Sequence, residues 1–112
     1  MMNICVAKHI NRDENNRVEY LFVNYDYYDG NDLVAKILHE KCGLEVGEKI
    51  EGEYFSVIPL YKNSLQYVLI WHEDVGNYIY SEKQDGVKNL ERYVKVIEKE
   101  LNLLFKNKNN SF

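Results

Sequence analysis

Few residues in this chain have the types and spacing that chemistry requires, and the clearest group is His72, Glu73 and Asp74. A histidine beside two carboxylates could bind a metal ion or act as a general base. Because neighbouring residues on a strand point to opposite faces, only His72 and Asp74 could converge. Polar residues after an apolar run also form ordinary turns. We therefore predict no catalytic residue here, and a small enzyme with a site near His72 and Asp74 stays open as an alternative.

The other candidate motifs do not complete a known site. His39 and Glu40 would need a second histidine at position 43 to form a zinc-protease motif, and position 43 is glycine. We expect His39 to face solvent, and it forms only a weak pair with Cys42. No Gly-x-Ser-x-Gly, Cys-x-x-Cys or glycine-rich phosphate loop occurs. The sequence therefore predicts neither a cofactor nor a metal ion.

Acidic and aromatic side chains alternate near the end of an expected strand. Asp26, Asp29 and Asp32 recur every third residue, which does not match a calcium loop. Turn and helix-cap chemistry would account for Asp29 and Asp32, and the tyrosines could equally be half-buried. Rigid aromatic residues beside acids are also typical of protein interfaces. We predict a partner-binding surface of Tyr25, Asp26, Tyr27, Tyr28, Asp29, Asp32, Glu73, Asp74 and Tyr78.

The charge of the chain favours a basic partner. The formal net charge is −4, and residues 1–87 carry −7 whereas residues 88–112 carry +3. A protein that binds nucleic acid directly needs a basic surface, so we expect no direct nucleic-acid binding. An acidic body can attract a basic protein, although ordinary solvated surface has the same composition.

The two cysteines and the N-terminus indicate a compartment. Cys5 and Cys42 stand in apolar contexts, and we expect both to be reduced, buried thiols. The first residues contain no apolar stretch long enough for a signal peptide. No segment approaches the roughly 20 apolar residues of a membrane span. We therefore expect a cytoplasmic protein that does not bind membranes.

The predicted fold is arranged around an apolar run, Leu65–Trp71, which has no polar face and is typical of a central strand. We expect strands at 4–10, 17–27, 54–61, 65–71 and from 78, and helices at 32–42 and 87–105. The order ββαβββα predicts a two-layer α+β fold, with a mainly antiparallel five-stranded sheet and two helices on one face. Residues 1–105 would form a single domain and residues 106–112 a flexible tail.

Single residues refine the ends of these elements. Asn31 or Asp32 is expected to cap the first helix, and Gly43 is expected to end it. Pro59 lacks a backbone donor and should place its strand at an edge or a bulge. In the second helix an apolar stripe recurs every three or four residues, at Val87, Leu90, Val94, Ile97, Leu101 and Leu104.

In size, charge and abundance of tyrosine and asparagine, the whole chain resembles bacterial immunity proteins, including those of contact-dependent growth inhibition systems. The resemblance implies tight binding to a cognate protein toxin, often a nuclease with a basic active site. The acids would then face the toxin's Lys and Arg, and the tyrosines would supply contact area. An alternative is a phage or plasmid inhibitor whose acids mimic nucleic-acid phosphates against a host defence nuclease. Self-association through the Pro59 strand or the tyrosines also stays open.

Overall fold

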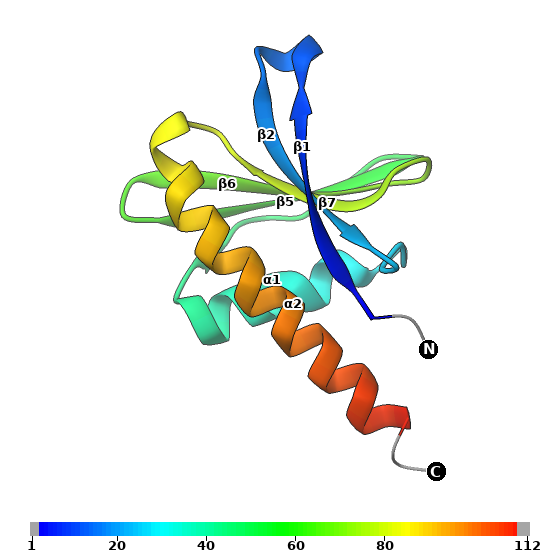
Figure 1. Ribbon diagram of the computed structural model, residues 1–112. Coiled ribbons are helices and arrows are strands. Elements are labelled where there is room, and N and C mark those ends of the chain that lie inside the picture. Colours follow the sequence, from blue (N-terminus) through cyan, green and yellow to red (C-terminus); the bar gives the residue numbers. More distant parts are fainter. Residues whose placement is uncertain (1–2, 110–112) are drawn as a thin grey trace.

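The computed structural model describes residues 3–109, which form an antiparallel sheet and two long helices (Figure 1). Short 3₁₀ helices occupy Arg12–Glu14 and Gln84–Gly86. The main elements are β1 (Cys5–Asn11), β2 (Arg17–Val23), α1 (Gly30–Cys42), β3 (Glu45–Val46), β4 (Ile50–Glu51), β5 (Phe55–Lys62), β6 (Leu65–His72), β7 (Gly76–Ser81) and α2 (Val87–Asn109).

Within residues 3–109 the sheet has seven strands, where the sequence predicted five. Its order is β1-β2-β7-β6-β5-β3, and β4 also pairs with β5. All pairings are antiparallel, and β6 lies in the interior as its apolar sequence predicts. The two additional strands, β3 and β4, have two residues each, and such short segments carry no recognisable alternation.

Pro59 does not place β5 at the edge of the sheet, so that part of the prediction is wrong. β3 and β4 both pair with the outer side of β5, and Pro59 lies between the two paired segments. The outer ladder is interrupted there because proline has no N–H to donate. The Pro59 carbonyl still accepts a hydrogen bond from the Gly47 N–H at 2.8 Å. Because of the proline, the outer side of β5 pairs with two short strands, β3 and β4, and not with one continuous strand.

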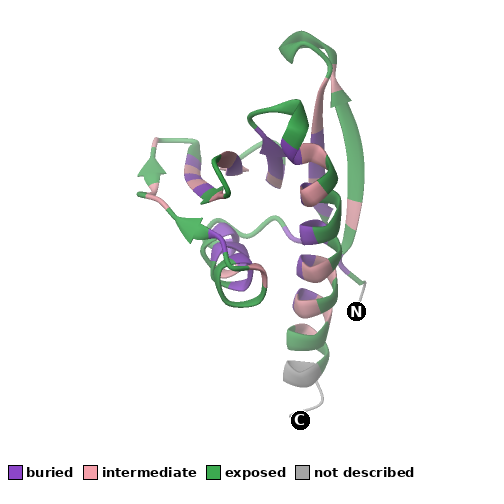
Figure 2. Cartoon of the chain, turned by 90° about the vertical axis from the view of Figure 1, so that its left-hand side faces the viewer, coloured by how far each residue is buried: buried purple, intermediate pink, exposed green. Residues whose placement is uncertain are grey.

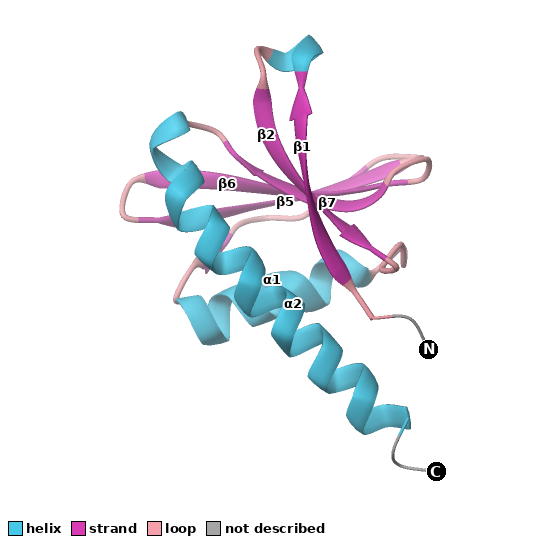
Figure 3. Ribbon diagram, viewed as in Figure 1, coloured by secondary structure: helices cyan, strands magenta, loops and turns pink. Residues whose placement is uncertain are grey.

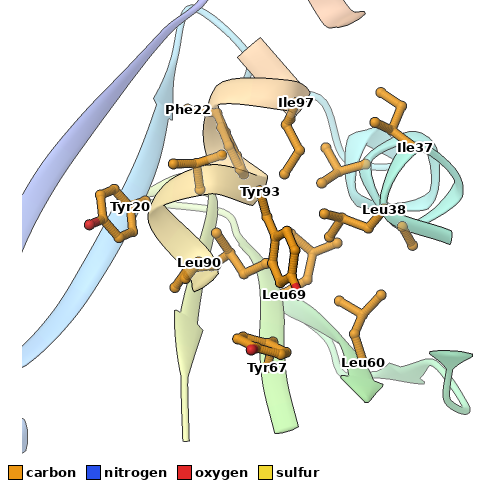
Figure 4. Packing of buried hydrophobic residues seen from close by; sticks show 14 of the residues in the cluster. Tyr20, Phe22, Ile37, Leu38, Leu60, Tyr67, Leu69, Leu90, Tyr93 and Ile97 are labelled. Carbon is orange, nitrogen blue, oxygen red and sulfur yellow. The ribbon is translucent and has the colours of Figure 1, made fainter. Parts of the chain in front are cut away.

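Both helices pack on one face of the sheet, which confirms the two-layer α+β arrangement (Figure 3). Tyr67 and Leu69 of β6 point to this face and are fully buried. Their neighbours come from both helices. In Figure 4, Tyr93 of α2 lies between Tyr67 of the sheet and Leu38, which belongs to α1. The Tyr67 and Tyr93 rings meet edge to face with centroids 5.5 Å apart. Removing a buried leucine side chain such as Leu69 typically costs about 2–5 kcal/mol.

Helix α1 begins two residues earlier than predicted. Its N-cap is Asp29, whose side chain makes no capping hydrogen bond, so the prediction of Asn31 or Asp32 as the cap is wrong. Asn31 is instead fully buried and donates to Ser56 Oγ at 2.8 Å. Gly43 ends the helix as expected, with a φ of 73° that favours glycine.

Helix α2 follows the predicted stripe through its first four turns. Leu90, Val94, Ile97 and Leu101 are buried, whereas Leu104 is 46% exposed because it lies beyond the sheet. The helix continues to Asn109, four residues beyond its predicted end. Residues 106–109 of the expected tail are therefore helical, and residues 110–112 lie outside the described residues.

The exposed surfaces of the fold include most of the outer strand β1, in which only Val6 and Asn11 are partly buried (Figure 2). Cys5 on this strand is exposed, which contradicts its expected burial, because β1 is an edge strand and the face of Cys5 carries no helix. Cys42 is partly buried, and burial raises the pKa of its thiol. In the described residues, neither helix combines the length and apolar character needed to span a bilayer.

Candidate functional site

The loop of residues 24–29, between β2 and α1, carries most of the predicted partner-binding residues. β2 ends at Val23, four residues before its predicted end, because Asn24 adopts a φ of 68°. The Tyr25 side chain turns inward and its hydroxyl donates to the Gly30 carbonyl at 2.8 Å. Tyr25 is only 2% exposed, so it cannot supply the contact area predicted for it and acts as a core residue.

Two side chains from the sheet hold this loop in place. The Asn77 amide donates to the carbonyl oxygens of Tyr25 and Tyr27, at 2.9 and 3.1 Å. The Trp71 indole N–H donates to the Asp26 carbonyl oxygen at 3.0 Å. Three consecutive loop carbonyls are thereby fixed by β6 and β7. A fixed backbone keeps the side chains that it carries in defined positions.

Gly30 allows the start of α1 to approach this anchor closely. A Cβ atom at Gly30 would lie 2.8 Å from Asn77 Nδ2 and 2.8 Å from the Tyr25 ring. Both neighbours are buried and hydrogen-bonded, so neither can move aside without losing contacts. The close packing of the loop and the start of α1 against β7 therefore requires glycine at position 30.

The next two tyrosines of the loop project outward. Tyr27 and Tyr28 are 55% and 53% exposed, so both rings are accessible to solvent. The Tyr28 ring packs edge to face on Trp71, with centroids 4.9 Å apart. Its hydroxyl donates to Glu51 Oε1 at 3.2 Å. Tyr28 is thus exposed on one side and supported on the other.

Acidic residues surround these tyrosines. Asp26, Asp29 and Asp32 are all exposed, and Asp32 lies 3.0 Å from Lys49 Nζ. Glu51 lies 3.4 Å from the same nitrogen. Burial acts to lower the pKa of Lys49, but hydrogen bonds and charges from Asp32 and Glu51 outweigh it and raise that pKa. Lys49 neutralises part of the acidic charge and orders two of the carboxylates.

The turn between β6 and β7 lies beside the same loop. A Cβ atom at Gly76 would overlap Asp26 Oδ1, so the turn and Asp26 are in direct contact. The Glu73 N–H donates to the Tyr54 carbonyl at 2.9 Å, which brings Tyr54, 54% exposed, to the turn. Glu73 and Asp74 are exposed there. We call this surface the acidic end, and it comprises Asp26, Tyr27, Tyr28, Asp29, Asp32, Glu51, Tyr54, Glu73 and Asp74.

Tyr78 is separated from the acidic end, contrary to its inclusion in the predicted surface. Asn77 points to the helix-covered face, so its neighbour Tyr78 points to the opposite face of the sheet. There Tyr78 is half-buried, and burial together with the charge of Glu19 raises its pKa.

The sequence did not single out several residues that complete the acidic end. Lys49 and Glu51 stand between the expected helix at 32–42 and the expected strand at 54–61, which begins with Tyr54. Their proximity to Tyr28 and Asp32 follows from the pairing of β4 with β5. Trp71 was assigned to the central strand without its role in holding the loop. No local pattern in the sequence indicates these contacts between distant residues.

The two histidines of the sequence-predicted candidates, His72 and His39, lie in different parts of the described chain. His72 Nδ1 accepts a hydrogen bond from the Asp74 backbone N–H at 3.1 Å, which is a turn contact. His39 is exposed and its Nδ1 lies 2.9 Å from the Leu44 carbonyl oxygen, at the far end of α1. That end is about 14 Å along the helix from Gly30. Within residues 3–109, no three His, Cys, Asp or Glu side chains are grouped to hold a metal ion.

Comparisons with known proteins give no relative for this chain. No protein-family model, curated protein or solved structure matches it.

Proposed function

We propose that this protein is a binding module of the immunity-protein type, which neutralises a cognate protein toxin by direct contact through the acidic end. The observation that carries the proposal is the exposed Tyr28 ring, which is supported by Trp71, hydrogen-bonded to Glu51 and carried by a loop that also holds the exposed Asp26 and Asp29. Tyrosine is among the residues that contribute most to binding at protein interfaces. Acids around it specify a basic partner surface.

The fixed loop supports this proposal because a preorganised surface loses little entropy on binding. Asn77 and Trp71 already hold the backbone of Tyr25–Tyr27 in the free protein. Tyr27 and Tyr28 need not be ordered by the partner. Such a surface suits tight and specific binding more than a transient encounter.

The charges supply steering as well as contacts. Carboxylates on one side of a protein attract a basic partner and raise the association rate, particularly at low salt. Asp26 and Asp29 make no ion pair among the described residues, so their charge is available to a partner. Asp32 and Glu51 are partly neutralised by Lys49.

A second candidate is an inhibitor of a host nuclease whose carboxylates mimic nucleic-acid phosphates. The same acidic end would serve this function. Exposed Tyr27, Tyr28 and Tyr54 among the acids favour a surface that buries aromatic area against a protein. A mimic should compete with DNA or RNA for the nuclease, and its affinity should fall steeply as salt rises. A toxin-specific protein should ignore host nucleases.

The proposal is tested by co-expression with the product of the gene immediately upstream, the candidate toxin. We expect a stoichiometric complex that survives moderate salt, and cells protected from the toxicity of that product. A Tyr28→Ala, Asp29→Asn variant should protect less well at the same expression level. Full protection by this variant, or no complex with the native protein, would contradict the proposal.

A further inference from the structure

An apolar groove runs between the 24–29 loop and the end of α2. Its volume is about 620 Å³, within the range of ligand-binding pockets. Leu33 of α1 and Leu104 of α2 form its walls. Tyr27 and Phe105 supply its aromatic surface, and the buried Tyr25 ring contacts both of them. Leu104 and Tyr27 are 46% and 55% exposed, so the groove is open to solvent.

The three aromatic rings at the groove, those of Tyr25, Tyr27 and Phe105, pack against one another. The Tyr25 ring meets Tyr27 and Phe105 edge to face, with centroids 5.4 and 6.1 Å away. The Tyr27 and Phe105 rings stand 6.1 Å apart with only 24° between their planes. Ring faces carry partial negative charge and attract cations, so a cluster of rings at an open groove suits a positively charged group.

Asp29 is the only charged residue that lines the groove in the described chain. It caps α1 by position, but its carboxylate makes no capping hydrogen bond and no ion pair among the described residues. The N-terminus of a helix carries a partial positive charge of about half a unit. The two negative charges of Asp29 and Asp32 are larger, so the start of α1 stays negative. The groove therefore combines apolar walls, aromatic rings and an available negative charge.

We propose that this groove binds an arginine side chain of the protein partner. The aliphatic stem would lie on Leu33 and Leu104, and the guanidinium would lie by the aromatic rings and pair with Asp29. This inference rests on the proposed function, and it specifies one group of the basic partner. Arginine fits better than lysine because its guanidinium is planar, weakly hydrated and stacks on aromatic faces.

The test uses short blocked peptides and requires no toxin. The probe is acetyl-Gly-Arg-Gly-amide, and the matched control replaces arginine by citrulline, which has nearly the same shape without the charge. A second control uses norleucine, which retains an aliphatic stem alone. Backbone amide resonances of the ¹⁵N-labelled protein are followed by NMR while each peptide is added to tens of millimolar.

We expect the arginine peptide to shift the resonances of Tyr27, Asp29 and Phe105 and to bind about tenfold more tightly than the citrulline peptide. Asp29→Asn should remove most of this preference, while Glu82→Gln, an exposed acid after β7, should not. Equal binding of citrulline or norleucine would overturn the proposal. Shifts confined to other residues, or no shift at all, would overturn it as well.

Failure of this inference and failure of the proposed function give different results. A complex with the toxin that weakens in Tyr28→Ala and does not change in Leu104→Ala, together with no peptide binding, removes the groove and leaves the acidic end. If the arginine peptide binds and no toxin complex forms, the groove is an arginine-binding site but the immunity function is contradicted. Leu104 is 46% exposed, so its truncation should leave the fold intact.

Discussion

Asn77 Nδ2 lies 2.9 Å from the carbonyl oxygen of Tyr25, although 52 residues separate them in the chain. This hydrogen bond joins β7 to the loop before α1. The same amide nitrogen also reaches Tyr27, so one buried side chain positions the backbone of the acidic end. Binding through this surface should therefore depend on a residue that the partner never contacts.

Asn77→Ala should destabilise the protein and loosen the loop. Asn77 is 1% exposed, and its loss removes the side-chain donor to the Tyr25 carbonyl and leaves the Tyr27 carbonyl only the Gly30 N–H at 3.0 Å. We expect the free energy of unfolding, measured with urea, to fall by about 1–3 kcal/mol. Backbone amide exchange at Tyr27 and Tyr28 should accelerate. The control, Asn89→Ala, removes a surface hydrogen bond to Arg92 and should change stability by less than about 0.5 kcal/mol.

Neutralising Asp26 and Asp29 together should slow association with the basic partner by about tenfold at low salt. The melting temperature should hardly change, because both carboxylates are exposed and unpaired among the described residues. Stopped-flow association rates for the Asp26→Asn, Asp29→Asn protein provide the measurement. The matched control is Glu40→Gln, Glu82→Gln, which removes the same charge elsewhere. Equal slowing by both pairs would show that net charge, and not the acidic end, controls association.

Tyr28→Ala should weaken the toxin complex far more than it weakens the fold. Its ring is 53% exposed, and we expect the dissociation constant to rise about 30-fold. Tyr61 offers a comparison because it is 40% exposed on β5 and lies outside the acidic end. Calorimetric titration of both alanine variants would reveal the difference. Similar losses in the two variants would contradict the assigned surface.

Tyr25 should make the stability decrease at high pH. Burial, with added repulsion from Asp29, raises the pKa of Tyr25 well above its usual value near 10. The folded state then keeps a proton that the unfolded state releases, so its stabilising contribution is complete below pH 10 and is lost as pH rises further. Urea unfolding at increasing pH should show a shallower alkaline decline for Tyr25→Phe than for the native protein. Parallel declines would mean that Tyr25 does not contribute.

The sequence predicted the elements that carry strong periodicity. The apolar run of β6 and the stripe of α2 correctly indicated an interior strand and a helix packed on the sheet, because both patterns extend over many residues. The connection at 44–53 allowed a short irregular strand, but not the two strands β3 and β4, since two residues pair with β5 without any alternation of their own. Cys5 looked buried because sequence alone does not show which face of β1 lacks a helix.

The candidate site was only partly predictable, because its geometry depends on contacts between residues that are far apart in the sequence. The residues of the 24–29 loop could be selected by type, but Tyr25 and Tyr27 look alike in sequence while one is 2% and the other 55% exposed. Their difference arises from Asn77, Trp71 and Gly30, which belong to other elements. Contacts across long sequence separations decide which tyrosine is structural and which is available to a partner.

The most direct test is hydrogen exchange of the backbone amides in the complex with the candidate toxin, compared with the free protein. If the partner binds the acidic end, protection on binding is concentrated at residues 24–32, 49–54 and 72–76, which carry that surface. Protection confined to β1, or to the sheet face that carries Tyr78, would contradict it. Either of these results would place the partner on a different surface.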